Sequence, residues 1–518
     1  MSQAGREVLL KAVVQAIPTF AMGSFLLPVG LIHDIEMMIL KFWCGQRGEQ
    51  RKIHWKKWEI LCKLKNMGGM GFKDLVKFNE AMLAKQVWRL LTDDSSLYYM
   101  VFKAKYFPNG SVFEAKVAAG SYAWRSILKA RGLIQRGMLW RVGDGRNINI
   151  YADRWLPSEG SVKIISPQVD TAKEWTVAQL IDSNGGGWND HLIDSLFLQF
   201  EAQRIKGIPL CLSRQEDCIT WPRCKSSTYS VKSGYQVLCE LESAEEASTS
   251  SDEKFKSFWR NIWQLRVPNK VKIFLWRACT DALPTKVNLQ KRKVVDNSVC
   301  NLCQKASEDT FHAVWGCDTV QSVWQPSFAW LQNQNNQLKT ISDLVGIVLS
   351  GSARLDVFAM VAWSVWCYRN KIRCNEQTVP VNKVFDTTVV ILTEFQQKFP
   401  GHGPKLKQSP ARWKPPAIGE LKANFDGAVF VDTGEAGIGV VIQNEFGEVM
   451  ATLSEKIALP PSVETLELLA ARRAAVFAVE LGLQKISFEG DAEGVIKALL
   501  QRDVTHSPVG HLLKTSGL

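Results

Sequence analysis

Four residues in the second half of the chain form the pattern Cys300-x2-Cys303-x8-His312-x4-Cys317. Two thiolates separated by two residues can hold one face of a tetrahedral ion, and an imidazole and a third thiolate can complete it. A full set of four ligands leaves no open coordination position, so the pattern predicts a closed, structural Zn²⁺ site. The alternative is that Cys300 and Cys303 are chance neighbours and that His312 is a core histidine.

The overall composition is that of a basic, globular chain with room for several domains. Its 518 residues are 46% hydrophobic and carry a formal net charge of +12, and this length suits roughly three domains of about 100–200 residues. An excess of Lys and Arg favours a polyanionic partner, because it releases counterions from phosphates. The remaining cysteines are dispersed, which is typical of reduced thiols and not of a disulfide framework.

One apolar stretch, residues 8–32, has the hydrophobicity of a signal sequence or a membrane span. It is interrupted by Lys11, Pro18 and Pro28, which a spanning helix tolerates poorly. We therefore expect a core helix and a turn in this stretch, and no association with a membrane.

Two stretches of biased composition divide the chain. Residues 240–256 are acidic and rich in Ser, Ala and Glu, and residues 396–420 are basic and rich in Pro. Both compositions are typical of linkers. The expected parts are a helical region, a connecting region, a second helical region and an α/β domain, at residues 1–110, 111–239, 257–395 and 421–518.

Hydrophobic periodicity predicts helices in three places. The residues that carry it are Leu9, Leu10, Val13 and Ile17; Phe78, Met82, Leu83, Val87, Leu90 and Leu91; and Phe258, Trp259, Ile262, Trp263, Val271, Phe274, Leu275 and Trp276, the last run being divided by Pro268. Residues 140–151 instead predict a strand, a Gly-Asp-Gly turn and a second strand.

The C-terminal part of the sequence places three acids at regular points of a strand and helix pattern. Asp426 lies in an expected strand that a hairpin follows, Glu467 lies on an amphipathic helix, and Asp491 ends a second strand. This order can bring the three carboxylates to one edge of a mixed sheet. Such a cluster suits two Mg²⁺ ions and the hydrolysis of a phosphodiester.

Each of these acids also has an ordinary interpretation. Asp426 and the glycine after it can form a turn, Glu467 can be a solvated helix residue, and Asp491 can cap a helix. Neighbouring acids compete for the same roles, namely Glu464, Glu489 and Glu493. From the residues alone, the shared metal site stays one hypothesis among several.

Taken in order, several segments resemble the C-terminal region of plant non-LTR retrotransposon reverse transcriptases. The opening is similar to the segment after the polymerase core of those proteins, and three further segments are similar to their connecting region. The segment that leads into Cys300 resembles their reverse-transcriptase zinc-binding domain, and the C-terminal part resembles their ribonuclease H-like domain. The segments are residues 2–28, 68–91, 140–157, 229–238, 258–285 and 421–518.

The resemblance implies particular roles in a ribonuclease H-type endonuclease, a hydrolase that cleaves RNA in RNA–DNA hybrids with Mg²⁺. Asp426 of FDGA matches the first catalytic Asp of the family. Glu467 of ELLAARRA matches its helix Glu, in preference to Glu464, and Asp491 of FEGDAEGV matches the Asp that ends the fourth strand.

The expected fold class is therefore multidomain. The N-terminal and middle regions are expected to be mostly α with a small β element. An α/β ribonuclease H-like domain follows, with a mixed sheet and flanking helices, and it is truncated at its C-terminal end.

Two departures from the family bear on activity. The sequence contains no Tyr/Phe-x-Asp-Asp polymerase motif, so we expect no reverse transcriptase activity. It ends at Leu518, before the expected positions of the family's last strand and helix, its fourth acid and a nearby His, and His506 and His511 lie too early for that role. Cleavage by this polypeptide is accordingly one hypothesis, and an inactive, zinc-containing nucleic-acid-binding remnant is the alternative.

The expected partner is an RNA–DNA hybrid or another nucleic acid, and a separate reverse transcriptase is a second candidate. The resemblance implies a nuclear location, with the cytoplasm as the alternative. The sequence leaves the oligomeric state open.

Overall fold

The computed structural model describes residues 2–46, 52–116, 120–157, 163–169, 174–182, 187–210, 215–224, 226–246, 252–332, 338–351, 354–399, 414–430 and 433–500. Two compact units form, and neither is a continuous stretch of chain. The first unit comprises residues 1–22, 27–79 and 242–409, and the second comprises residues 23–26, 80–241 and 410–518. The domain boundaries expected from composition stay predictions.

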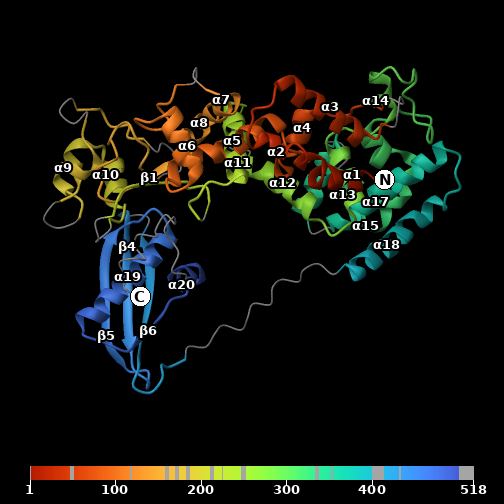
Figure 1. Ribbon diagram of the computed structural model, residues 1–518. Helices are drawn as coiled ribbons and strands as arrows, with labels where there is room; N and C mark the ends of the chain where they lie inside the picture. The colour runs from red at the N-terminus through yellow and green to blue at the C-terminus, as the bar shows by residue number, and fades with distance from the viewer. Residues whose placement is uncertain are drawn as a thin grey trace. The chain divides into compact units, whose positions relative to one another are not determined.

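The first unit is helical (Figure 1). Its α-helices are α1 Gln3–Ala12, α2 Thr19–Met22, α3 Val29–Cys44, α4 Trp58–Cys62, α12 Asp252–Gln264, α13 Asn269–Cys279, α14 Lys286–Lys291, α15 Gln321–Gln332, α16 Ile341–Ser350, α17 Leu355–Arg373 and α18 Val384–Lys398. Its short helices are η1 Val14–Ala16, η2 Lys65–Met67, the π-helix η5 His312–Gly316, η6 Asp318–Val320 and η8 Val381–Lys383. The expected helical runs through residues 9–17 and 258–276 correspond to α1 with η1 and to α12 with α13.

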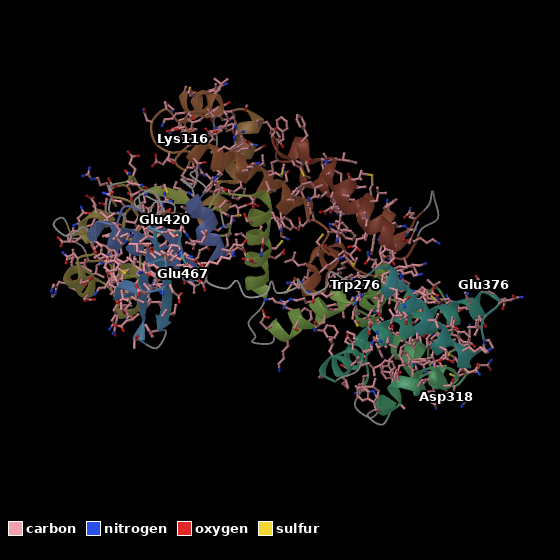
Figure 2. All side chains as sticks on the ribbon, turned by 90° about the horizontal axis from the view of Figure 1, so that it is seen from below. Lys116, Trp276, Asp318, Glu376, Glu420 and Glu467 are labelled. Carbon is pink, nitrogen blue, oxygen red and sulfur yellow. The ribbon has the colours of Figure 1, made fainter. Side chains whose placement is uncertain are left out.

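Helix α17 provides much of the core of the first unit. Phe358 is fully buried, and its ring lies 5.1 Å from that of Trp324, which in turn lies 4.9 Å from that of Trp315. Trp276 of α13, which Figure 2 labels, is also buried. These tryptophans therefore serve as packing anchors, in agreement with the periodicity of the sequence.

The apolar stretch 8–32 folds into short helices and not into one long helix. Helix α1 ends at Ala12, α2 covers Thr19–Met22, and α3 begins at Val29 directly after Pro28. None of the helices in the described parts of the chain is long and apolar enough to cross a membrane.

The second unit combines helices with two small sheets. Its elements are α5 Leu75–Thr92, whose first turn belongs to the other unit, α6 Leu97–Tyr106, α7 Tyr122–Lys129, α8 Arg131–Gly137, β1 Leu139–Arg141, η4 Val177–Leu180, α9 Asp190–Leu196, α10 Gln199–Lys206, β2 Cys218–Thr220, α11 Val231–Glu246, β3 Leu421–Phe430, β4 Glu435–Gln443, β5 Val449–Ala458, α19 Val463–Glu480, β6 Ile486–Glu489 and α20 Glu493–Leu500. Helix α5 matches the periodicity expected at residues 78–91.

The hairpin expected at residues 140–151 is wrong. Strand β1 pairs antiparallel with β2, which lies far along the chain, so that Leu139 is opposite Thr220 and Arg141 is opposite Cys218. The glycine-containing segment after β1 therefore does not return the chain to a neighbouring strand.

The physical reason is a carboxylate that the local pattern did not include. Asp217 lies just before β2, and its side chain accepts hydrogen bonds from the backbone N–H groups of Gly143, Gly145 and Asn147 at 2.7, 2.9 and 2.8 Å. These bonds wrap the loop around the carboxylate and satisfy the donors that a hairpin would have used.

The C-terminal domain, as far as residue 500, is a mixed sheet with strand order β5-β4-β3-β6. Strands β3, β4 and β5 are antiparallel, and β6 runs parallel to β3. Helix α19 packs its alanine-rich face on β3 and β4, and Figure 1 shows it lying across the strands. The expected fold class is confirmed: a mostly helical chain with small sheets, ending in an α/β domain with a mixed sheet.

The acidic stretch 240–256, predicted as a linker, is helical in its described parts. Residues 240–246 belong to α11 and residues 252–256 belong to α12. The same Ala, Glu and Leu residues that suggested a solvated linker also have high helix propensity, which is why they can extend both helices. Most of the Pro-rich stretch 396–420, namely residues 400–413, lies outside the described residues, as do His506 and His511.

Replacing Asp217 by Ala should lower the free energy of unfolding by about 2–4 kcal/mol, because three backbone donors lose a charged acceptor. Asp94, which is exposed, provides the matched control, and Asp94→Ala should change stability by less than about 0.5 kcal/mol. Urea denaturation of the two variants measures the difference. Equal stability of Asp217→Ala and wild type would contradict the role given to this carboxylate.

Candidate metal centres

The structure brings the four residues of the Cys/His pattern together in the first unit. One ligand atom from each of Cys300, Cys303, His312 and Cys317 lies within 4.8 Å of the others. The Sγ atoms of Cys300 and Cys317 are 3.9 Å apart, and Cys303 Sγ lies 3.4 Å from His312 Nε2. The two thiols of the first pair are buried, and the second pair is half-buried.

A tight turn presents the first two cysteines. The N–H of Gln304 donates to the carbonyl of Cys300 at 3.0 Å, and the N–H of Leu302 lies 3.4 Å from the Cys300 sulfur. Gln304 has a φ of 55°, so the turn places a residue other than glycine in the left-handed region. This backbone strain is typical of a segment that the surrounding structure holds in a functional conformation.

The other two candidate ligands come from a π-helix. His312 begins η5, where its N–H donates to the Asp309 carboxylate at 2.7 Å, and Cys317 follows the end of that helix. A π-helix has a wider turn than an α-helix and often marks a functional site. Here it sets the spacing between the imidazole and the last thiol.

A buried ion pair supports this cluster from α17. Arg369 donates to Glu308 at 2.6 Å and approaches Cys300 Sγ at 3.1 Å. Burial opposes ionisation of the Cys300 thiol, but hydrogen bonds from the Cys303 N–H and from Arg369 lower its pKa to about 6. Burial raises the pKa of Cys317. The site therefore favours a thiolate at Cys300.

Sequence reasoning missed Arg369 and Glu308. A signal was present, because Arg369 continues the helical stripe of Phe358 and Val365 on the buried face of α17, at spacings of seven and four residues. A single cation on an apolar stripe indicates a buried anionic partner. The partner itself, far away in sequence, could not be read from that stripe.

The second cluster combines three carboxylates of the C-terminal domain. One oxygen from each of Asp426, Glu467 and Asp491 lies within 4.8 Å of the others. Asp426 is on β3, Glu467 is in the first turns of α19, and Asp491 comes just after β6. The structure therefore assembles the three acids that the sequence singled out.

Two glycines allow the backbone to approach this closely. A Cβ at Gly427 would lie 2.5 Å from Leu466 Cγ, next to Glu467 on α19, and a Cβ at Gly490 would lie 2.5 Å from the Phe425 ring. Larger residues at either point would push the helix or the strand end away from β3. The Asp-Gly and Gly-Asp pairs thus position the acids through packing, and the turn interpretation of Asp426 is wrong because this residue lies within a strand.

Glu467 differs from its two neighbours in burial. Only 5% of its surface is exposed, and its Oε2 has no hydrogen-bond partner among the described residues, whereas Asp426 and Asp491 are exposed. Burial raises the pKa of Glu467, and the nearby charges of Asp426 and Asp491 raise it further. A group in this position is stabilised by a proton or by a cation. The interpretation of Glu467 as a solvated residue is therefore wrong.

The competing acids are accounted for elsewhere. Glu464 is exposed at the start of α19, and Glu489 forms an ion pair with Lys422 at 2.6 Å. Glu493 is exposed in the first turn of α20. Within the described residues, none of these three joins the group of carboxylates that could share an ion.

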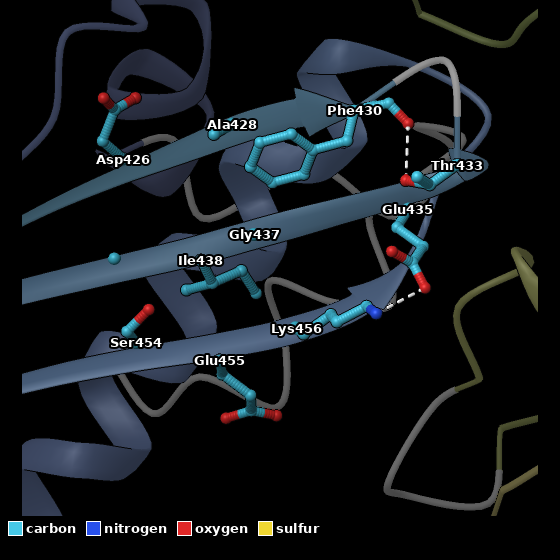
Figure 3. Close-up of a pocket in the computed structure, with 11 residues that line it drawn as sticks. Asp426, Ala428, Phe430, Thr433, Glu435, Gly437, Ile438, Ser454, Glu455 and Lys456 are labelled. Carbon is cyan, nitrogen blue, oxygen red and sulfur yellow. Dashed lines mark hydrogen bonds and ion pairs between the residues drawn. The ribbon is translucent and has the colours of Figure 1, made fainter.

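An open concavity of about 580 Å³ lies beside Asp426 on the sheet. Figure 3 shows it between β3, β4 and β5, with Asp426 near one end and Thr433, Glu435 and Lys456 near the other. Because Gly437 and Gly439 have no side chains, the sheet surface is depressed in the middle of the concavity. The concavity therefore gives an extended ligand access to one of the three acids.

Two family models match the chain. A family described as "zinc-binding in reverse transcriptase" matches residues 229–324, which include all four Cys/His residues, and a family described as "reverse transcriptase-like" matches residues 424–516, which include all three acids. A protein of Arabidopsis thaliana named "Putative ribonuclease H protein" is 26% identical over 99% of this chain and 84% of its own length. An uncharacterized mitochondrial protein of the same plant is 40% identical over 28% of this chain and 95% of its own length.

Over these two segments the chain is similar to the plant retrotransposon reverse-transcriptase family. It carries the zinc-binding and ribonuclease H-like domains of that family, in this order along the sequence. The resemblance of the sequence to the family is confirmed.

Two solved structures are similar to parts of this retrotransposon-type chain. Ribonuclease H1 from the archaeon Halobacterium salinarum is 27% identical and covers 19% of this chain and 79% of its own, with a TM-score of 0.16. The N-terminal ribonuclease H domain of a Mycobacterium tuberculosis protein, fused to maltose-binding protein, is 21% identical and covers 19% and 70%, with a TM-score of 0.17. Scores this low do not establish a shared fold, and the fold described above rests on the strand order.

The geometry of the Cys/His cluster fits Zn²⁺. Tetrahedral Zn²⁺ with ligand bonds of about 2.0–2.3 Å separates two sulfurs by about 3.8 Å and a sulfur from a nitrogen by about 3.5 Å. The observed separations of 3.9 and 3.4 Å are close to both values. The match to a zinc-binding family supports zinc in this domain, while the ligand role of each residue stays a prediction.

The acidic cluster of the ribonuclease H-like domain fits a divalent cation. Mg²⁺ binds oxygens at about 2.0–2.1 Å, so oxygens on one ion are about 3–4 Å apart. The three carboxylates need only small side-chain adjustments to reach that spacing, and the unpartnered oxygen of Glu467 would gain a ligand. The choice of Mg²⁺ among divalent ions stays a prediction.

Replacing Cys300 by Ser should remove one bound Zn²⁺ per chain and lower the free energy of unfolding by about 3–5 kcal/mol, because metal binding stabilises the folded first unit. Elemental analysis and urea denaturation measure the two effects. Cys374→Ser, at an exposed thiol, is the matched control and should change neither. Full zinc content in Cys300→Ser would rule out this residue as a ligand.

Glu467 should make the protein less stable when it is ionised and no Mg²⁺ is present. The folded state holds its proton more tightly than the unfolded state, because the folded pKa is raised. The stability that protonated Glu467 contributes is therefore present at low pH. It is lost as pH rises through the pKa that Glu467 has in the folded state. At pH 7 without Mg²⁺, Glu467→Gln should raise the Tm by roughly 2 °C or more, and the gain should shrink at lower pH.

Thermal unfolding of wild type and Glu467→Gln from about pH 4 to 8 measures this difference. The control is Glu464→Gln, exposed one turn earlier on α19, which should give no gain in Tm. A Glu467→Gln variant that is less stable than wild type at pH 7 would mean that the carboxylate has a stabilising partner in the apo protein.

Proposed function

We propose that the C-terminal α/β domain is a Mg²⁺-dependent endonuclease that cleaves the RNA strand of an RNA–DNA hybrid. The observation that carries this proposal is the buried Glu467, with an oxygen that has no described partner, between Asp426 and Asp491. A fold maintains three close carboxylates at a cost in stability, which is typical of a site that binds cations. The comparisons support the coarser statement of a ribonuclease H-like function related to nucleic acid.

In this proposal Asp426, Glu467 and Asp491 hold Mg²⁺ by their carboxylate oxygens. When bound, Mg²⁺ neutralises the phosphate and lowers the pKa of a water molecule, so that hydroxide is available near neutral pH. Hydrolysis adds water across the bond between phosphorus and the 3′ oxygen: the water oxygen bonds to phosphorus, and a proton goes to the leaving oxygen. The exposed Asp426 and Asp491 face the substrate, and the buried Glu467 fixes the position of the site.

Selection of a hybrid would depend on backbone shape and on 2′-hydroxyl groups and not on base sequence. The concavity beside Asp426 suits this task in shape, because glycines form its middle, and Ser454 supplies a donor along it. Thr433 and Lys456 also line it, with their donors directed to the carbonyl of Phe430 and to Glu435. A sugar-phosphate backbone carries the acceptors that such donors bind.

A second candidate function is nucleic-acid binding without cleavage. The net charge of +12 and the Cys/His cluster favour it. Both features would support binding of a nucleic acid even if the three carboxylates catalyse no cleavage. A nuclear location and a separate reverse transcriptase as partner stay predictions of the sequence, and we propose no polymerase activity for this chain.

The purified chain should cleave a labelled RNA–DNA hybrid in Mg²⁺, and Asp426→Asn should lower the rate by at least about 10²-fold, because one metal ligand is lost. Glu464→Gln, an exposed acid on α19, is the matched control and should retain the wild-type rate. Cleavage that survives in Asp426→Asn would point to another site. Absence of cleavage by folded wild type, with binding retained, would favour the second candidate function.

A further inference from the structure

A small basic pocket lies in the first unit, on residues that the proposed nuclease and the Cys/His cluster do not use. It has a volume of about 180 Å³, and the described residues that line it are Glu7, Val8, Lys11, Lys65, Trp263, Asn269, Lys272 and Ile273. They come from α1, η2, α12 and α13, and Figure 1 shows α1 beside α13. Segments that lie far apart in this unit's sequence therefore build one concave surface.

The charges of this pocket do not balance. Lys11 and Lys65 both contact the same oxygen of Glu7, each at 2.8 Å, and Lys272 donates to the carbonyl of Trp263 at 3.0 Å. Two ammonium groups therefore share one carboxylate and the third binds a neutral carbonyl, which leaves a surplus of two positive charges among these four side chains. Like charges held together in a partly desolvated place favour the arrival of an anion.

The lysines are held in place by their surroundings. Lys65 Nζ lies 4.3 Å from the centre of the Trp263 ring, and the indole N–H donates to the Lys65 carbonyl at 3.1 Å. Lys11 also donates to the carbonyl of Met70 at 2.6 Å. Burial lowers the pKa of Lys11 and of Lys272, and the neighbouring charge of Lys65 lowers both further. These side chains are therefore fixed at some cost, unlike solvated surface lysines.

A helix terminus adds to the positive potential. Helix α13 begins at Asn269, one of the lining residues, and its N-cap, Pro268, offers no side-chain cap. The first N–H groups of a helix carry a partial positive charge and are ready donors for an anion. The terminus and the three lysines thus converge on the same pocket.

We propose that this pocket binds a backbone phosphate of a nucleic acid. Phosphate oxygens match the donors that the pocket presents: ammonium groups and the N-terminus of a helix. A pocket of this kind would position a nucleic acid without reading its sequence, because the lysines reach the backbone and not the base edges. Val8 and Ile273 add apolar surface to the lining, and the volume of about 180 Å³ suits a compact anion.

The test measures binding of a labelled RNA–DNA hybrid to the full chain by fluorescence anisotropy, in the Asp426→Asn background so that no cleavage occurs. The double variant Lys65→Gln/Lys272→Gln should bind about tenfold more weakly at 0.1 M salt. Its slope of log Kd against log salt concentration should fall by about one, the loss of one phosphate contact. The double variant Lys339→Gln/Lys383→Gln, at two exposed lysines of the same unit, is the charge-matched control and should bind as the background does.

Glu7→Gln separates this proposal from a purely structural ion-pair network. Removing the carboxylate raises the positive charge of the pocket, so the hybrid should bind roughly threefold more tightly. If the network only holds α1 against its neighbours, Glu7→Gln would weaken binding or leave it unchanged while lowering the Tm, and the proposal would be overturned. Equal loss in the pocket variant and the control double variant would also overturn it, as an effect of overall charge.

The last experiment is a competition between the hybrid and inorganic phosphate. Added phosphate should displace the hybrid from the Asp426→Asn background better than chloride of equal ionic strength, and this difference should vanish in the double variant. A difference that persists in the double variant would place the phosphate effect elsewhere. Because no readout uses cleavage, failure of the proposed nuclease activity leaves these results interpretable.

Discussion

Repulsion between three carboxylates is the constraint around which the C-terminal domain is arranged. Strand β3, helix α19 and the end of β6 each bring one acid to the same point, and the acid on α19 is buried. The backbone tolerates this because α19 lies against the sheet with buried alanines and with Gly427 below Leu466. Close packing thus fixes three like charges that would separate if the elements were free to move. A cation relieves the repulsion, so the cost to the apo fold and the affinity of the site have the same origin.

The Cys/His cluster also gathers groups that must carry negative charge, and here protein side chains stabilise that charge in addition to a metal. Arg369 and Glu308 bring a buried ion pair against Cys300, and the guanidinium favours a thiolate there before any ion binds. The pair itself is costly to desolvate and contributes little net stability, so its value lies in the position and charge state that it gives the sulfur. In the acidic cluster no described protein cation takes the equivalent place beside Glu467. One site is therefore supported from within the fold, and the other depends on an added ion.

Local patterns in the sequence predicted those elements whose signal is itself local. The periodicity at residues 78–91 became α5, and the order of strands and helix around Asp426, Glu467 and Asp491 became the C-terminal domain, because alternation and helical spacing are set by neighbouring residues. The errors concern distant partners. Strand β1 pairs with β2 because Asp217 accepts the hydrogen bonds that the loop after β1 donates. The ion pairs of Arg369 with Glu308 and of Lys65 with Glu7 join side chains that meet only after folding. No short window of sequence contains both members of such a pair, and the two compact units are likewise assembled from separate stretches.

The most direct measurement of the central claim is the location of a divalent ion in crystals of the chain soaked with Mn²⁺, by its anomalous scattering. Mn²⁺ takes the same oxygen ligands as Mg²⁺ and can be identified in the electron density. We expect an anomalous peak within about 2.5 Å of oxygens from Asp426, Glu467 and Asp491, with Glu467 Oε2 now coordinated. Three acids without a peak, with Glu467 protonated or turned away at neutral pH, would contradict the interpretation of this cluster as a metal site.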